Sequence, residues 1–187
     1  MRWSVCCQHA NGEWVNRRMR RRLVSLCAIM SLVAVAHPVL GDDTTMTTDP
    51  MLVLVGTYTG SGSEGIYTLR MDPASGQLER VAAQGGITNP SFLAVHPSLD
   101  YVYAVQETGE DNAVFAYRLG RATGELTPLG SRPAHGAAPC HLTVDPSGSA
   151  VIVANYSAGT LAVFRVQDDG SLSEATQVIQ HEGSGPD

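Results

Sequence analysis

Short apolar runs separated by turn-forming residues make up most of the chain after residue 50. The clearest example is residues 139–156, PCHLTVDPSGSAVIVANY, where apolar Leu142–Val144 and Ala150–Ala154 flank the segment Asp145-Pro146-Ser147-Gly148. Proline presets φ to about −65° and glycine tolerates positive φ, so this segment is typical of a tight turn. Two short apolar runs joined by such a turn predict a β-hairpin.

The same hairpin pattern occurs 49 positions earlier, at residues 90–107, PSFLAVHPSLDYVYAVQE. The same offset aligns Val114-Phe115 with Val163-Phe164, and Val102–Val105 with Val53–Gly56. A repeat of about 50 residues in a sequence of short strands indicates the blades of a β-propeller. The predicted fold class is therefore all-β, a propeller of four-stranded antiparallel blades.

About three blades are present, which predicts a partial ring: blade one spans 51–84, blade two 89–131 and blade three 139–180. The predicted strands are 51–57, 65–71 and 77–83 in blade one, 92–95, 101–105, 113–119 and 125–130 in blade two, and 141–144, 150–155, 160–166 and 171–179 in blade three. Blade one lacks an opening strand. Since propellers close into rings of about four to eight blades, we expect further blades, with a strand from the far C-terminus completing blade one.

The first 41 residues have the pattern of a secretory signal peptide. Residues 17–22 contain five arginines, and the apolar run 23–36 that follows is too short to span a bilayer. An uncleaved membrane anchor is the alternative. Residues 42–50 are polar and threonine-rich, which is typical of a linker. We therefore expect a periplasmic or secreted protein with no stable membrane insertion after cleavage.

The charge balance argues against polyanionic partners. The chain has no lysine, and from residue 42 onward six arginines face seventeen acidic residues, a net charge of −11. Such a surface repels nucleic acid and anionic lipid. Cys140 is the only cysteine in the repeats, and no CxxC spacing occurs. We interpret Cys140 as a small residue at a strand start, since no second cysteine is available for a disulfide or a metal site.

Candidate chemistry is expected at one mouth of the propeller. If the strands of each blade alternate in direction, the start of the first strand and the end of the second lie on the same rim. This rim collects polar and titratable side chains, namely Tyr58, Glu107, His141, Asn155 and Tyr156. The opposite rim holds ordinary turn residues, so we interpret His96 as structural and place a substrate site at the polar mouth.

Each candidate has two possible roles. A neutral His141 offers one donor and one acceptor for substrate oxygens, or it forms a blade-to-blade hydrogen bond. Glu107 activates water or orients a substrate hydroxyl, or it is a solvated loop carboxylate. Asn155 and Tyr156 bind a sugar-like ligand or cap strand ends, and Tyr58 is a weaker mouth candidate.

Several motifs resemble the lactonase family of seven-bladed β-propellers, which includes 6-phosphogluconolactonase. They are VGTYTGSGSEGIYTL (55–69), NPSFLAVHP (89–97), PCHLTVDPSG (139–148), ANYSAGTLAVF (154–164) and HEGSGPD (181–187). The resemblance implies hydrolysis of a sugar lactone by activated water, without a metal or other cofactor, in a protein that is monomeric at full length. It also implies that this chain is only the N-terminal part.

In that family the main catalytic histidine and arginine follow the GSGP segment, so the resemblance assigns no catalytic residue up to Asp187 and predicts an inactive chain. Two alternatives remain open. A calcium-dependent propeller lactonase would use glutamate and asparagine ligands, here Glu107 and Asn155. A non-catalytic secreted propeller would serve as a binding or scaffold module, because one fold hosts many functions.

Overall fold

The structure, a computed structural model, describes residues 4–6, 51–108 and 111–183. Apart from residues 4–6, the predicted signal peptide and linker lie outside these ranges. Within them, no helix is both long enough and apolar enough to cross a membrane.

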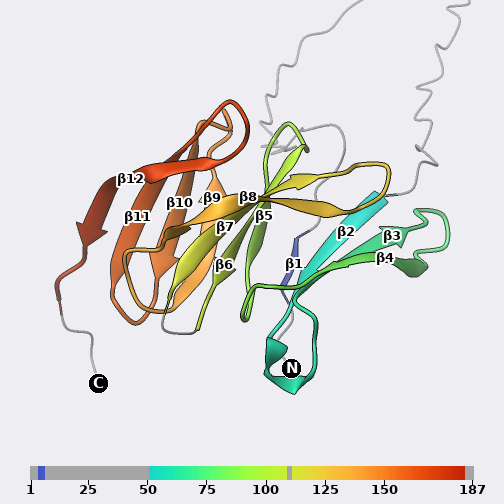
Figure 1. The fold of residues 1–187 in the computed structure, drawn as a ribbon, viewed down its shortest axis with the longest axis horizontal. Coiled ribbons are helices and arrows are strands. Elements are labelled where there is room, and N and C mark those ends of the chain that lie inside the picture. The colour runs from blue at the N-terminus through green and yellow to red at the C-terminus, as the bar shows by residue number, and fades with distance from the viewer. Residues whose placement is uncertain (1–3, 7–50, 109–110, 184–187) are drawn as a thin grey trace, which may run out of the picture.

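Three four-stranded antiparallel sheets lie side by side in chain order, as Figure 1 shows. The first sheet contains β1 (Ser4–Cys6), β2 (Met51–Gly56), β3 (Ile66–Met71) and β4 (Leu78–Gln84), with the short 3-10 helix η1 (Thr59–Ser61) after β2. The second contains β5 (Leu93–Val95), β6 (Tyr101–Gln106), β7 (Ala113–Leu119) and β8 (Leu126–Pro133). The third contains β9 (Pro139–Val144), β10 (Ala150–Asn155), β11 (Thr160–Val166) and β12 (Leu172–Gln180). The predicted partial propeller of three blades is confirmed.

Blade one differs from the prediction because it has an opening strand. Ser4–Cys6 forms β1 and pairs antiparallel with β2, with Val5 opposite Val55. In this structure a segment from the predicted signal peptide therefore lies at the edge that we expect a strand from the far C-terminus of a longer protein to fill. The reason is general: an unpaired sheet edge offers a row of N–H and C=O groups to any extended segment that reaches it.

The 49-residue offset fails in the third strand of blade three. Phe164 pairs with Val151, whereas Val102, the counterpart of Val151, pairs with Tyr117. Phe164 is therefore equivalent to Tyr117, not to Phe115 as the apolar runs predicted. The connection before β11 has four residues (156–159) and the one before β7 has six (107–112). A two-residue shift leaves every side chain on its original face, so the hydrophobic pattern could not reveal it.

Two apolar cores hold the three sheets together. Between blades one and two the buried residues are Leu54, Ile66, Ile87, Leu93, Val102, Ala104, Tyr117, Leu119 and Leu126. Between blades two and three they are Tyr103, Val105, Val114, Ala116, Ala134, Leu142, Val151, Val153, Ala162, Phe164 and Leu172. Blade two thus buries one face against blade one and the other against blade three, which fixes the relative positions of the strand ends that form the mouth.

The rim opposite the mouth is built from tight turns, as the sequence indicated. His96 Nε2 lies 3.0 Å from the Gly148 carbonyl oxygen of the next blade, which confirms the structural interpretation of His96. The Asp145 carboxylate accepts hydrogen bonds from the Ser147 hydroxyl and from the backbone N–H of Ala150. These bonds, that from Ser147 above all, lower the pKa of Asp145 from 3.8 to about 2.

Candidate functional site

The polar mouth is formed where the second strand of each blade ends. Tyr58, Glu107 and Tyr156 follow β2, β6 and β10 and lie 49 positions apart in the sequence. They are therefore the same position in three consecutive blades. The starts of β5 and β9 lie on the same rim because β6 and β10 run antiparallel to them.

Two of the predicted site residues meet across the joint between blades one and two. The Tyr58 hydroxyl donates a hydrogen bond of 2.6 Å to Glu107 Oε2. Tyr58 is 38% exposed and Glu107 is half-buried, so the pair is accessible from solvent. A hydrogen bond to a carboxylate is charge-assisted and stronger than a neutral one. The structure thus pairs Tyr58, the weaker candidate for substrate binding in the sequence, with Glu107.

Asn89 holds this pair from the connection that precedes β5. Its φ is 47°, a left-handed conformation that asparagine tolerates better than most residues. Its Oδ1 accepts hydrogen bonds from the Thr59 backbone N–H at 2.7 Å and the Thr59 hydroxyl at 3.1 Å. Its Nδ2 donates to the Thr108 hydroxyl, and its carbonyl oxygen accepts from the Glu107 N–H at 3.3 Å. Asn89 thereby positions the residues next to both Tyr58 and Glu107.

The equivalent position in blade three is Ala138, which also has a positive φ, of 54°. Its carbonyl oxygen accepts a hydrogen bond of 2.8 Å from the Tyr156 N–H, as Asn89 does for Glu107. Alanine has no polar side chain with which to hold the adjacent loop. Tyr156 is 81% exposed, so this second corner of the mouth is more open than the first.

Replacing Asn89 with glycine tests its role in holding the mouth. Glycine accepts the positive φ, so the substitution removes the side-chain hydrogen bonds without adding backbone strain. We expect the free energy of unfolding to fall by about 1–3 kcal/mol, because partners in the joint are left unsatisfied. Ala138→Gly is the matched control, and it should leave stability unchanged or raise it by up to about 1 kcal/mol through relief of left-handed strain. Equal losses in both variants, measured by denaturant unfolding, would contradict the assignment.

His141 is exposed at the start of β9, and its ring packs on Phe92 of blade two. The ring centroids lie 4.2 Å apart with an interplanar angle of 42°. Phe92 precedes His141 by 49 positions, so the contact joins equivalent positions of neighbouring blades. Among the described residues His141 makes no hydrogen bond to another blade. The contact between the blades at this point is aromatic.

Asn155 lies inside the protein and does not reach the mouth. It is 2% exposed, and its Nδ2 donates to the Ala134 carbonyl oxygen at 2.8 Å and the Thr160 hydroxyl at 2.9 Å. Gln106, its counterpart in blade two, accepts a hydrogen bond from the Thr88 N–H at 3.1 Å. The amide at this position therefore caps the strand end and holds the connection that leads to the next blade, as the capping alternative described.

The two residues of the calcium alternative belong to separate hydrogen-bond networks. Glu107 bonds Tyr58 of the neighbouring blade, whereas Asn155 uses its amide inside blade three. Within residues 4–6, 51–108 and 111–183, no three His, Cys, Asp or Glu side chains gather in a way that could hold a metal ion.

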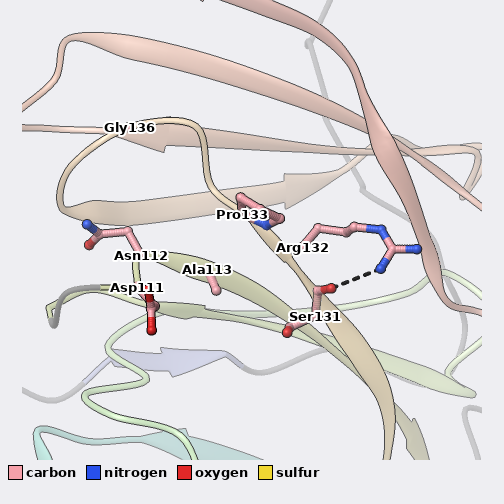
Figure 2. A pocket seen from close by; sticks show the side chains of 7 residues that line it. All are labelled: Asp111, Asn112, Ala113, Ser131, Arg132, Pro133 and Gly136. Atoms are coloured by element: carbon pink, nitrogen blue, oxygen red, sulfur yellow. Dashed lines mark hydrogen bonds between the residues drawn. The ribbon is translucent and has the colours of Figure 1, made fainter.

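A cleft of about 530 Å³ lies where β7 of blade two begins and β8 ends, beside the connection that leads to blade three (Figure 2). It is lined by Asp111, Asn112, Ala113, Ser131, Arg132, Pro133 and Gly136. Arg132 Nη1 donates to the Ser131 carbonyl oxygen at 3.1 Å, and its Nε lies 3.3 Å from a carboxylate oxygen of Glu174. None of the five predicted site residues lines this cleft. The sequence patterns did not single out Arg132, whose one signal is that it is one of only six arginines after residue 42.

Comparison with known proteins identifies similar chains. The sequence profile of the family described as "Lactonase, 7-bladed beta-propeller" matches residues 52–187. A 6-phosphogluconolactonase of Bacillus subtilis is 36% identical over 132 residues, which are 71% of this chain and 38% of that relative.

Solved structures of lactonases are also similar to this chain. A structure described as a putative 6-phosphogluconolactonase from Bacteroides fragilis has a TM-score of 0.71 and 37% identity, over 78% of this chain and 40% of that one. The structure of a periplasmic gluconolactonase from Pseudomonas aeruginosa has a TM-score of 0.66 and 31% identity, over 71% of this chain and 39% of that one. This chain therefore spans about two fifths of the length of the relatives it matches.

Proposed function

Because this chain belongs to the lactonase family of seven-bladed β-propellers, we propose that the whole protein is a sugar-lactone hydrolase of the 6-phosphogluconolactonase type. The observation that carries the proposal is the family match over residues 52–187. The reaction adds water to the lactone carbonyl carbon, breaks the ring ester bond and returns a proton to the leaving oxygen. We assign none of the described residues to that proton transfer.

The described part of the mouth contributes substrate binding in this proposal. The Glu107 carboxylate can accept hydrogen bonds beyond the one from Tyr58, since an ionised carboxylate has about four lone-pair sites. A sugar lactone presents several hydroxyl donors that match such an acceptor. His141, exposed beside Phe92, offers a ring N–H or a ring acceptor to the same ligand.

The proposed location is the periplasm or the exterior. The arginine-rich segment followed by the apolar run 23–36 supports this, and so does the likeness to a periplasmic gluconolactonase from Pseudomonas aeruginosa. The acidic balance after residue 42 supports a small-molecule substrate over nucleic acid or an anionic membrane surface. We further propose that the whole protein is a monomer that uses no cofactor.

Lactone hydrolysis by two proteins tests the function. The 187-residue chain alone should show no turnover of glucono-δ-lactone, because it covers only part of the family's ring. A chimera in which residues 52–187 replace the matched segment of the Bacillus subtilis relative should hydrolyse the lactone.

Within that chimera, Glu107→Gln should lower kcat/KM by about 10- to 100-fold, as loss of a charge-assisted hydrogen bond to substrate predicts. Glu79→Gln, at an exposed position of β4, is the control and should leave kcat/KM unchanged. A folded chimera without turnover would argue against the proposed reaction. Equal activities of the Glu107→Gln variant and the parent would argue against Glu107 as a substrate ligand.

A further inference from the structure

We propose that Glu107 makes the mouth select a neutral sugar lactone over the same lactone carrying a phosphate group. This choice of lactone refines the proposed function and therefore rests on it. The Glu107 carboxylate lies at the mouth, where the Tyr58 hydroxyl holds it at 2.6 Å. Among the described residues, no arginine lies beside it to attract an anion.

Carboxylates set the charge of the described part of the mouth. The position that follows the second strand is Tyr58 in blade one, Glu107 in blade two and Tyr156 in blade three, so Glu107 is the acidic member of this set. Asp111, two residues before β7, adds a second carboxylate on the same rim because β7 runs antiparallel to β6. The nearby rings of Phe92 and His141 contribute aromatic surface.

Most of the arginines lie at the other end of the blades. The chain has no lysine, so only the six arginines after residue 42 could offset the charge of Glu107. The third strand of each blade runs antiparallel to the second, so it ends at the rim opposite the mouth. Four of the six arginines lie near that end of the third strand or in the turn after it, namely Arg70, Arg118, Arg121 and Arg165.

The other two arginines lie on the last strands, β4 and β8, and each is paired with a carboxylate. Arg80 Nη2 lies 2.5 Å from Glu64 Oε1. Arg132 Nε lies 3.3 Å from Glu174 Oε1. Within residues 51–108 and 111–183, every arginine is thus either at the opposite rim or already paired on an edge strand, and none neutralises Glu107.

Backbone N–H groups are the other means by which proteins bind phosphate. At this part of the mouth, the N–H groups next to the candidate residues are bonded within the protein. The Glu107 N–H donates to the Asn89 carbonyl oxygen at 3.3 Å, and the Thr59 N–H to Asn89 Oδ1 at 2.7 Å. The Tyr156 N–H donates to the Ala138 carbonyl oxygen at 2.8 Å. A phosphate group placed here would meet a carboxylate without gaining these donors.

A carboxylate discriminates between the two lactones by hydrogen bonding and by charge. An ionised carboxylate only accepts hydrogen bonds, which suits a sugar hydroxyl, whereas a phosphate group carries a charge of about −1.5 to −2 and offers acceptors. A six-carbon lactone is at most about 8 Å long, given carbon–carbon bonds of about 1.5 Å. Because the Debye length at physiological salt is also about 8 Å, salt does not fully screen the repulsion in any orientation of the ligand.

The chimera of residues 52–187 with the Bacillus subtilis relative tests the selection. kcat/KM is measured for glucono-δ-lactone and for its 6-phosphate, and the ratio of the second value to the first reports the selectivity. Glu107→Gln should raise this ratio about 5- to 20-fold, because the hydrogen bond is lost for both lactones but the repulsion is relieved only for the phosphorylated one. Glu107→Asp keeps the charge, so its ratio should stay within about twofold of the parent.

Glu79→Gln is the charge-matched control, because it removes the same unit of charge from a different place. Glu79 lies opposite Arg70 in the sheet, towards the rim away from the mouth. Its ratio should equal that of the parent, since the proposed repulsion is local and does not come from net charge. The parent ratio should also rise with ionic strength, and this dependence should weaken in the Glu107→Gln variant.

An unchanged ratio in the Glu107→Gln variant, with both lactones hydrolysed, would overturn the proposal. A residue that only holds a strand end would lower kcat/KM equally for the two lactones, so the ratio separates that role from selection. A folded chimera that hydrolyses neither lactone counts against the proposed function instead, and the selection is then decided by a measurement that needs no turnover.

That measurement uses an anionic and a cationic nitroxide with the 187-residue chain, each added separately. The paramagnetic relaxation of the backbone amide protons of Glu107 and Thr108 is recorded by NMR. The anionic probe should relax these protons at least about threefold less than the cationic one, and Glu107→Gln should remove most of the difference. A difference that Glu107→Gln and Glu79→Gln reduce equally, or no difference in the parent chain, would overturn the proposal.

Discussion

Gly170→Ala is expected to lower the free energy of unfolding by about 2–5 kcal/mol, the combined cost of left-handed strain and overpacking. Gly170 has a φ of 87°, and a Cβ there would lie 2.2 Å from Cδ1 and Cε1 of Tyr101. The Tyr101 side chain is held by two other contacts, which restrict its movement away from an added methyl group. Arg118 Cζ lies 5.1 Å from its ring centroid, and the His96 ring packs against it in a T-shaped arrangement with the ring centroids 5.6 Å apart. Denaturant unfolding monitored by circular dichroism measures the loss.

Gly76→Ala is the matched control, because Gly76 is at the same turn position in blade one. Its φ is 71°, but nothing lies within 4 Å of a Cβ built there. Only the backbone strain remains, so the expected loss is about 1–2 kcal/mol. Equal losses in the two variants would show that the turn at Gly170 does not depend on close packing against Tyr101 of the preceding blade.

Phe164→Ala is expected to cost about 3–5 kcal/mol, the usual range for emptying an aromatic site in a packed core. Phe164 is 0% exposed and belongs to the core between blades two and three. It lies opposite Val151, also fully buried. Thermal and denaturant unfolding of the variant both measure the effect.

Two substitutions in blade two check the corrected register at the same time. Tyr117→Ala should cost about as much as Phe164→Ala, since Tyr117 is the true counterpart and is 1% exposed. Phe115→Ala should cost less, because Phe115 is only half-buried. A larger loss for Phe115→Ala than for Tyr117→Ala would restore the alignment that the apolar runs suggested and would contradict the strand pairing.

The candidate site was predictable as a set of positions but not as a set of contacts. The 49-residue spacing of Tyr58, Glu107 and Tyr156 is visible in the sequence and places them on one rim. Whether the side chains of neighbouring blades touch depends on the distance between sheets, which no local pattern contains. The structure pairs Tyr58 with Glu107 at 2.6 Å and leaves Tyr156 81% exposed.

Asn155 shows a second limit of the sequence. Its place at a strand end is compatible with ligand binding and with capping, and both remained open. The choice is made by the connection through Ala134 and Gly136, which folds over the amide and supplies its hydrogen-bond acceptor. A loop that comes 21 positions earlier in the chain decides the burial of this residue.

The alternation of apolar and polar residues, the proline–glycine turns and the internal repeat determined the blade architecture, because these signals act between residues close together in the chain. The tertiary structure alone decided that Ser4–Cys6 completes blade one, that Phe164 is the counterpart of Tyr117, and which polar side chains reach solvent. Each of these outcomes depends on contacts between segments that are far apart in the sequence. Packing and hydrogen-bond satisfaction across the whole fold determine those contacts.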